Sequence, residues 1–224
     1  DIPRALAISI SSTDLDEDTL NHLLTESVQL NSNVFGMALG LEPGVLKHRE
    51  RYCPYVYREG LEIRSRRLDT PDYRYWTLPW YTEPLVSGQA MWSEPYYDEG
   101  GGDILMSTYS VPVIGEGRPL GIVTADISLQ RLEDIVSSIR ILDTGYAMLL
   151  SGSGRLIVYR DKAMIMKETI GTLANRLGNP SLAVLGEAMV SGQTGQLPVT
   201  GLEDGQTFRV YFRPVGKTGW SLGI

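Results

Sequence analysis

The stretch that decides the fold is "STYSVPVIGEGRPLGIVTADISLQRLEDIV", from Ser107 to Val136. Apolar and β-branched residues on both sides of the turn "GEGRP" predict two antiparallel strands, over residues 104–114 and 120–128. A helix is predicted next, over residues 128–142, because Ser128 is a suitable N-cap and apolar residues recur there at helical spacing. This order of elements indicates an α+β fold with an antiparallel sheet.

The segments on the N-terminal side predict one helix and then more strands. The run "TDLDEDTLNHLLTESVQL" (residues 13–30) is typical of a helix, with Thr13 or Asp14 as its cap and acidic residues in its first turn. The elements expected after it are strands over residues 34–44, 52–60 and 61–68, and a short helix near residues 80–86.

The C-terminal side repeats the pattern of a helix followed by strands, so the chain is expected to contain two similar halves. The elements expected here are a hairpin over residues 145–161, one or two short helices within residues 169–192, and strands over residues 194–200, 207–215 and 219–224. The predicted organisation is an N-terminal helix region (1–32), a first module (33–128), a linking helix (129–142) and a second module (143–224).

Composition excludes several classes of protein. A net charge of −7 over 224 residues argues against binding to nucleic acid or to anionic membrane surfaces, since both need clustered cations. The one basic run, "RSRRL" at residues 64–68, is expected to be a solvated face of a strand or loop. With one cysteine, Cys53, and two distant histidines, no internal disulfide and no metal site are expected.

The sequence also shows no pattern typical of a transmembrane segment or a signal peptide. No run of eighteen apolar residues occurs, so no membrane-spanning helix is predicted. The chain begins inside a plausible helix and stops inside the strand-like "GWSLGI". We therefore expect it to be a fragment of a larger protein.

An unusual concentration of aromatic and acidic residues lies between Tyr73 and Gly101, in "YRYWTLPWYTEPLVSGQAMWSEPYYDEGG". Aromatic rings are costly to expose and carboxylates are costly to bury, so their mixture needs a reason. Aromatic faces beside one or two carboxylates suit a bound cation. The alternative is an ordinary aromatic core, and Trp76 and Trp92 are expected to belong to one.

Several of these runs together resemble the double-Cache (PAS-like, PDC) extracytoplasmic sensor domain of bacterial and archaeal transmembrane receptors. They are "NSNVFGMALGLEPG", "WSEPYYD", the stretch quoted first, "GYAMLLSGSGRLIVY" and "VYFRPVGKTGWSLGI", and the resemblance covers roughly residues 15–224. It implies an α+β fold of two stacked PAS-like modules with antiparallel sheets and a long N-terminal helix. It also implies a small-molecule ligand in the membrane-distal first module, a membrane-proximal second module that passes the signal on, and flanking transmembrane helices outside this fragment. Because residues 143–224 hold no comparable cluster of aromatic and acidic residues, the second module is expected to have a filled core and to bind no small ligand.

The resemblance extends to a ligand-binding motif. Amino-acid-binding members share a Tyr, an Arg five residues later, a Trp-Tyr pair two residues after that, a Tyr-x-Asp, and an Asp in a later strand. The positions of this chain that match are Tyr73, Trp80, Tyr81, Tyr96, Asp98 and Asp126. These six are the predicted ligand-binding residues, with Asp98 near the mouth of the cavity and Asp126 as the deeper anchor.

The arginine of that motif is replaced by Leu78, which cannot form the forked hydrogen bonds that grip an α-carboxylate. We therefore expect an amine without an α-carboxylate or a quaternary ammonium, within the broader expectation of an amine or amino-acid-like ligand. Arg74 is an alternative source of the missing charge. On an extended strand, however, it would point to the face opposite Tyr73.

Three other functions compete with ligand sensing. An enzyme using Glu94 and Asp98 lacks a nucleophile motif, a metal cluster and a phosphate-binding loop, so no catalytic residue and no cofactor are predicted. A calcium site in "DEGGGD" (98–103) lacks the alternation of an EF-hand, and a flexible loop over the cavity is preferred. A ligand-free structural domain that dimerises through its N-terminal helix, or a sensor of a neutral or acidic metabolite, stays open.

Overall fold

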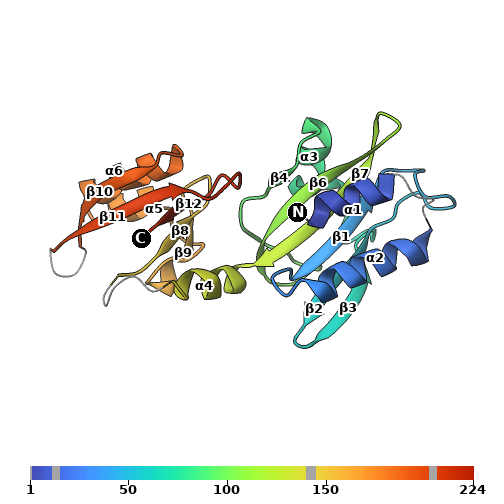
Figure 1. Cartoon of the computed structure of the whole chain (residues 1–224), viewed down its shortest axis with the longest axis horizontal. Coiled ribbons are helices and arrows are strands. Elements are labelled where there is room, and N and C mark those ends of the chain that lie inside the picture. Colours follow the sequence, from blue (N-terminus) through green and yellow to red (C-terminus); the bar gives the residue numbers. More distant parts are fainter. Residues whose placement is uncertain (1, 12–15, 140–144, 202–205) are drawn as a thin grey trace. The chain divides into compact units, whose positions relative to one another are not determined.

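A computed structural model describes residues 2–11, 16–139, 145–201 and 206–224. The chain divides into two compact units, Asp1–Ser128 and Leu129–Ile224, and each contains one antiparallel sheet (Figure 1). The predicted α+β class is confirmed. Among the described residues, no helix has both the length and the apolar character needed to cross a bilayer.

The first unit combines a seven-stranded sheet with three α-helices. The helices are α1 (Ile2–Ser11), α2 (Glu17–Leu30) and α3 (Pro79–Ser87), and a 3-10 helix, η1, spans Tyr75–Thr77. The strands are β1 (Gly36–Leu41), β2 (Pro54–Glu59), β3 (Glu62–Arg67), β4 (Met91–Trp92), β5 (Tyr96–Tyr97), β6 (Leu105–Gly115) and β7 (Arg118–Ser128). Their order is β3-β2-β1-β7-β6-β4, and β5 pairs with the end of β6.

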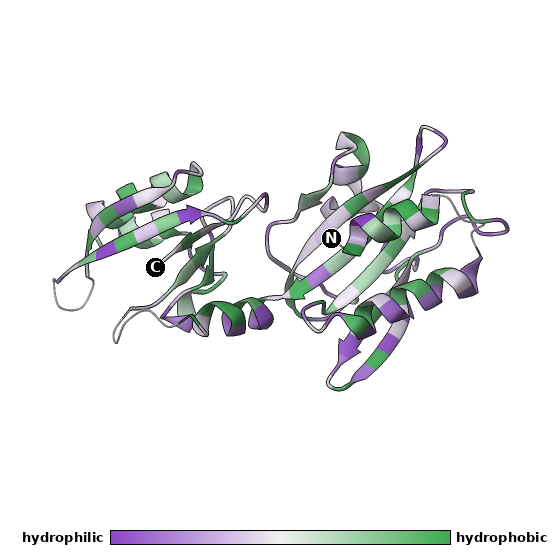
Figure 2. Cartoon of the chain, in the orientation of Figure 1, coloured by the Kyte–Doolittle hydropathy of each residue, from purple (hydrophilic) through white to green (hydrophobic). Residues whose placement is uncertain are grey.

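Alternation along the strands gives this sheet two different faces. On β1, Met37 and Leu39 point toward α1 and α2 and join a purely apolar core with Leu24. Ala38, between them, belongs to an aromatic cluster on the other face, together with Tyr55 and the residues of η1 and α3. Figure 2 shows green, apolar residues on one side of α2 and purple, polar residues on the other. Because successive strand residues point to opposite faces, one sheet serves two separate cores.

The helix α2 begins later than its sequence pattern suggests. Its cap is Asp16, whose carboxylate accepts a hydrogen bond from the backbone of Thr19 at 2.9 Å. The caps expected from the sequence, Thr13 and Asp14, lie outside the described residues. Capping by aspartate satisfies an N–H group that has no partner within the helix.

The C-terminal end of α2 is held by an arginine from the sheet. Arg58 on β2 donates to the carbonyl oxygens of Val28 and Asn31, and to that of Val34 at 3.0 Å. Replacing Arg58 with Met should keep the apolar stem of the side chain but leave these carbonyls without a donor. We expect the free energy of unfolding to fall by about 1–3 kcal/mol. Urea denaturation followed by circular dichroism would measure this. An equal loss in Arg64→Met, on the exposed hairpin strand β3, would contradict the capping role.

The second unit is built around a five-stranded sheet. Its helices are α4 (Leu129–Ser137), α5 (Ile170–Arg176) and α6 (Pro180–Val190), with a 3-10 helix, η2, at Lys162–Met164. Its strands are β8 (Met148–Leu150), β9 (Leu156–Val158), β10 (Gly195–Thr200), β11 (Thr207–Pro214) and β12 (Ser221–Gly223), in the order β10-β11-β12-β8-β9. The core lies between this sheet and α5 and α6, and it includes Leu150, Leu173 and Leu185.

Most predicted elements are present. The β2–β3, β6–β7 and β8–β9 hairpins and the helices α2, α3 and α4 are confirmed. Residues 64–67 of the basic run lie on the edge strand β3, Leu68 follows it as a buried residue, and Cys53 is fully buried just before β2. The two-residue strands β4 and β5, inside the aromatic segment, were not predicted. They matter because they hold that segment against β6.

Candidate functional site

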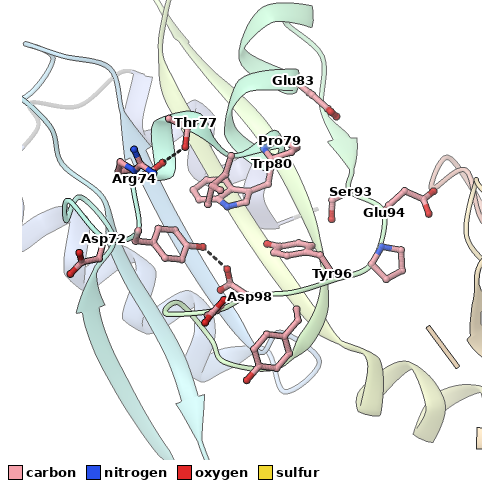
Figure 3. A pocket seen from close by; sticks show the side chains of 15 residues that line it. Asp72, Arg74, Thr77, Pro79, Trp80, Glu83, Ser93, Glu94, Tyr96 and Asp98 are labelled. Carbon is pink, nitrogen blue, oxygen red and sulfur yellow. Dashed lines mark hydrogen bonds between the residues drawn. The ribbon is translucent and has the colours of Figure 1, made fainter. Parts of the chain in front are cut away.

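A cavity of about 650 Å³ opens in the first unit, beside the aromatic cluster. It lies between the segment that contains η1 and α3 and the segment that contains β4 and β5, so both walls come from the stretch singled out in the sequence. The residues that line it are Asp72, Tyr73, Arg74, Thr77, Leu78, Pro79, Trp80, Glu83, Ser93, Glu94, Pro95, Tyr96, Tyr97, Asp98 and Glu99. Figure 3 shows the Trp80 ring, the Tyr96 hydroxyl and the Asp98 carboxylate directed toward the same space.

The wall formed by α3 is fixed by local sequence signals. Leu78 has an extended backbone and precedes Pro79, which takes the first helical position, where its missing N–H costs nothing. Gly88 ends the helix in the left-handed region, with φ of 65°. Trp80 is thereby held in the first turn of α3, where it is buried and lines the cavity.

Asp98 is the buried carboxylate of the cavity wall. It is 5% exposed; the Tyr73 hydroxyl donates to it, as does the backbone N–H of Gly102 at 2.7 Å. Burial raises the pKa of this carboxyl, and the hydrogen bonds from Tyr73 and Gly102 partly offset that increase. The structure therefore keeps a carboxylate at the cavity with two donors and room for a cation.

The loop after Asp98 is anchored. Asp103 accepts a hydrogen bond from the Gly100 N–H at 2.7 Å, and Arg66 on β3 donates to the Gly100 carbonyl at 3.1 Å and to Asp103 at 3.3 Å. The Asp98 and Asp103 carboxylates are thus already hydrogen-bonded to backbone N–H groups of the loop, and Asp103 also to Arg66. No cluster of three or more metal-ligating side chains occurs in the part of the chain that the structure describes.

Asp126 is not part of the cavity wall. It is 5% exposed, lies on β7 opposite Thr108 of β6, and accepts a hydrogen bond from the Thr108 hydroxyl at 2.8 Å. The Thr108 oxygen is in turn 2.8 Å from the hydroxyl of Tyr96, which does line the cavity. Burial, reinforced by the Asp98 charge, raises the pKa of Asp126 to about 7.

Tyr81 does not line the cavity either. Its hydroxyl donates to Glu42, and its ring meets Tyr75 edge-on with 4.9 Å between ring centroids. Gly40 of β1 lies beneath both rings, and a Cβ there would come within 2.9 Å of each. On α3 Trp80 and Tyr81 are adjacent, so their side chains diverge by roughly 100° around the helix axis and only Trp80 reaches the cavity. The prediction that all six residues line one cavity is therefore wrong for Tyr81 and Asp126.

Arg74 lines the cavity beside Leu78, contrary to the argument from strand alternation. Its backbone is not extended; with φ of 48° it lies in the left-handed region and caps η1. Its carbonyl accepts from Thr77 N–H at 3.0 Å and from the Thr77 hydroxyl at 2.9 Å. A turn at this position lets both Tyr73 and Arg74 face the same cavity.

The charge around the cavity is predominantly negative. Five lining residues are acidic and Arg74 is the one basic residue among them: the acidic ones are Asp72, Glu83, Glu94, Asp98 and Glu99. Trp80 adds a buried indole N–H that has no hydrogen-bond partner in the described structure. The site thus offers aromatic faces and carboxylates.

Comparison with known proteins gives consistent results. The profile of the family described as "Methyl-accepting chemotaxis protein-like, first PDC sensor domain" matches residues 20–134. The methyl-accepting chemotaxis protein PctB of Pseudomonas aeruginosa is 35% identical over 96 residues, which are 43% of this chain and 15% of PctB. The chain is therefore much shorter than that relative.

Solved structures share the fold over the whole chain. The extracellular domain of the proposed histidine kinase mmHK1S-Z3 superposes with a TM-score of 0.85 at 23% identity, covering 99% of this chain and 83% of that one. The ligand-binding domain of the amino acid chemoreceptor PctB of Pseudomonas aeruginosa, in complex with L-Arg, gives a TM-score of 0.67 at 28% identity, covering 99% and 82%.

Proposed function

Because this chain belongs to the family of methyl-accepting chemotaxis protein-like first PDC sensor domains, and is thus an extracytoplasmic sensor domain, we propose that its first unit binds a small cationic amine. The cavity that Tyr73 and Asp98 help to line is the proposed site. The observation that supports it is the buried Asp98 carboxylate among aromatic rings, with acidic residues around the rim. Binding would pass a signal to the rest of a receptor and involve no chemical conversion.

The charge balance favours a cation over an anion. Each aromatic face contributes about 0.5–2 kcal/mol to binding an ammonium group, depending on how far the group is desolvated. The Asp98 carboxylate adds a charge-assisted hydrogen bond. An anionic metabolite would meet five carboxylates against one arginine. The proposed site residues are therefore Tyr73, Trp80, Tyr96 and Asp98 on the wall, with Asp126 acting from behind it.

Arg74 supports a second candidate, an amino acid. PctB, whose binding domain has this fold, is described as an amino acid chemoreceptor in complex with L-Arg. In this chain Leu78 cannot hold a carboxylate, but the neighbouring Arg74 lines the same cavity. The second candidate is thus a molecule whose ammonium lies at Asp98 and whose carboxylate lies at Arg74.

A thermal-shift screen followed by isothermal titration calorimetry would separate the two candidates. The panel is putrescine, tyramine, choline, γ-aminobutyrate, L-arginine and succinate. A ligand at 100 times its Kd should stabilise the folded protein by roughly 2.7 kcal/mol. Binding of the first three supports the amine proposal, and tighter binding of γ-aminobutyrate and L-arginine supports the second. Binding of succinate alone would refute both.

Replacing Asp98 with Asn should weaken binding of any cationic ligand found in this screen. Asparagine keeps an oxygen that can accept from Gly102, but it removes the buried negative charge. We expect a loss of about 1.5–3 kcal/mol, which is about 10- to 150-fold in Kd. Titration calorimetry at pH 7.5 measures the change.

The matched control is Glu83→Gln, which removes an exposed carboxylate from the rim of the same cavity. Exposed charges are screened by salt, so we expect less than about a threefold change. Equal effects of the two substitutions would show that only the overall negative charge around the cavity affects binding, and that Asp98 is not a specific ligand-binding residue.

Dimerisation is a separate part of the proposal. We assign it to α1 and α2, whose exposed apolar residues Ile8 and Leu30 are 70% and 78% exposed. Analytical ultracentrifugation with and without the best amine would test it. A monomer at all concentrations, with Ile8→Lys and Leu30→Lys having no effect, would refute it.

A further inference from the structure

Tyr96, Thr108 and Asp126 form a chain of hydrogen bonds that leads from the cavity wall into the sheet. The two oxygen–oxygen distances are both 2.8 Å, and Thr108 and Asp126 are paired residues on β6 and β7. Thr108 is 1% exposed, so no solvent reaches the middle of the chain. A cavity residue is thus connected to a buried carboxyl through one hydroxyl.

The direction of these hydrogen bonds depends on the charge of Asp126. A hydroxyl has a single proton to donate. If Asp126 is ionised it can only accept, so Thr108 donates to it and Tyr96 must donate to Thr108. The Tyr96 oxygen then turns only lone pairs toward the cavity. If Asp126 carries a proton, it can donate to Thr108, Thr108 can donate to Tyr96, and the Tyr96 O–H is free to point into the cavity.

We propose that Thr108 is a positioning residue for ligand selectivity, which makes the charge on Asp126 decide whether Tyr96 offers the cavity a lone pair or an O–H. With Asp126 ionised, the wall accepts from an ammonium group. With Asp126 protonated, the wall donates and favours a neutral or acceptor ligand. This inference rests on the proposed function, because it concerns the ligand bound in the same cavity.

The surroundings of Asp126 place the change within the neutral pH range. The titratable groups that act on it or lie near it are Asp98, Tyr55 of β2, Tyr96 of β5 and Cys53. Burial raises the pKa of the tyrosines and the cysteine well above their usual values, and the Asp98 carboxyl raises the pKa of Asp126 further. The Tyr55 hydroxyl also lies near Asp126 and lowers the pKa of its carboxyl, whereas Thr108 makes the hydrogen bond to it, at 2.8 Å.

The test compares Thr108→Val with Thr108→Ser. Valine has nearly the shape of threonine and suits a strand, but it breaks both hydrogen bonds; serine restores the hydroxyl. The matched control is Ser110→Ala, two residues along the same strand and face. The Ser110 hydroxyl is also buried but has no hydrogen-bond partner in the described structure. Thermal melting confirms that each variant is folded.

Affinities for putrescine, tyramine and choline are measured by calorimetry between pH 6 and pH 8, where all three stay cationic. For wild type and Ser110→Ala we expect affinity to rise by up to about tenfold over this range, because binding favours ionised Asp126. For Thr108→Val we expect the affinity at pH 8 to fall about tenfold, to the wild-type value at pH 6, and Thr108→Ser should recover most of it. Thr108→Val with wild-type affinity and pH profile overturns the inference.

A ligand-free measurement separates this inference from the proposed function. Carboxyl carbon-13 NMR of Asp126 should show a titration near pH 7 that moves to higher pH in Thr108→Val, since one donor to the carboxylate is lost. If no amine binds wild type but this titration depends on Thr108, the amine function fails and the coupling between Thr108 and Asp126 stands. If amines bind and Asp126 titrates alike in wild type and Thr108→Val, the coupling between Thr108 and Asp126 fails and the amine function stands.

Discussion

Replacing Asp126 with Asn is expected to stabilise the ligand-free protein above pH 7 by about 2–4 kcal/mol. Burial raises the pKa of this carboxyl from 3.8 to about 7. Between these values the folded state holds a proton that the unfolded state releases, so stability falls as pH rises from about 4 to about 7 and stays low above that range. The full shift corresponds to about 4 kcal/mol, and asparagine avoids most of that cost because it has no charge to bury.

The same substitution should weaken amine binding by about 1.5–3 kcal/mol, because the negative charge behind Tyr96 is lost. Denaturation curves at pH 3.5 and pH 8 measure the first effect: the variant and wild type should nearly coincide at the lower pH and separate at the higher one. Asp72→Asn, an exposed carboxylate at the same cavity, is the control and should change neither curve. A variant that is less stable than wild type at pH 8 would show that Asp126 supports the fold rather than the ligand.

Replacing Gly121 with Ala is expected to destabilise the first unit by about 3–5 kcal/mol. Gly121 on β7 pairs with Leu41 of β1, at φ of 154°. A Cβ there would lie 2.1 Å from the Gly40 carbonyl oxygen and 2.9 Å from the Leu41 Cα, and both of these are backbone atoms. Because neither can rotate away as a side chain could, β1 and β7 would have to separate.

Gly117→Ala is the matched control in the turn of the same hairpin. Its φ is 76°, but a Cβ would meet nothing within 4 Å, so only the backbone conformation is penalised, by about 1–2 kcal/mol. Urea denaturation of the three proteins gives the difference. If Gly121→Ala and Gly117→Ala lose the same stability, the close approach of β1 and β7 has no special cost. Loss of soluble expression in Gly121→Ala alone agrees with the larger figure.

Most of the fold could be predicted because its elements are marked by local signals. Hairpins with glycine turns and helices with apolar stripes depend on short-range patterns, and both kinds were found. The strands β4 and β5 could not be predicted in this way, because each has two residues and forms only by pairing with β6. Such strands depend on tertiary context and leave no periodicity in the sequence.

The candidate site was predicted in part. Tyr73, Trp80, Tyr96 and Asp98 line one cavity, since a motif that preserves order and spacing also preserves their elements. The motif could not show that Tyr81 faces the core, because this depends on the rotation of α3 against the sheet. The role of Thr108 was missed for a different reason. A threonine in a strand looks like an ordinary β-former, and only the register of β6 against β7 places it beside Asp126.

Arg74 illustrates a third kind of error. The strand argument assumed that residues 73 and 74 are extended, whereas Arg74 has a left-handed backbone. Non-glycine residues adopt this region in only a few per cent of cases, and arginine has no special preference for it. Sequence propensities therefore give no warning, although the consequence is a cation at the edge of the proposed ligand site.

The order of strands also determines how the protein can meet other chains. An outer strand with free N–H and C=O groups invites another strand to pair with it, which leads to aggregation. In the first sheet, β3 carries Arg64, Arg66 and Glu62 along one edge, and the opposite edge consists of the two-residue strands β4 and β5. In the second sheet, β10 contains Pro198, which cannot donate, and β9 is a short buried strand packed by α4.

None of these four borders is a long apolar strand. Extension of either sheet by a second molecule is therefore disfavoured, which suits an extracytoplasmic domain that is not meant to aggregate. The proposed dimerisation through α1 and α2 would use helical surfaces instead, where contacts between side chains form and break without changing the hydrogen bonds of the sheets.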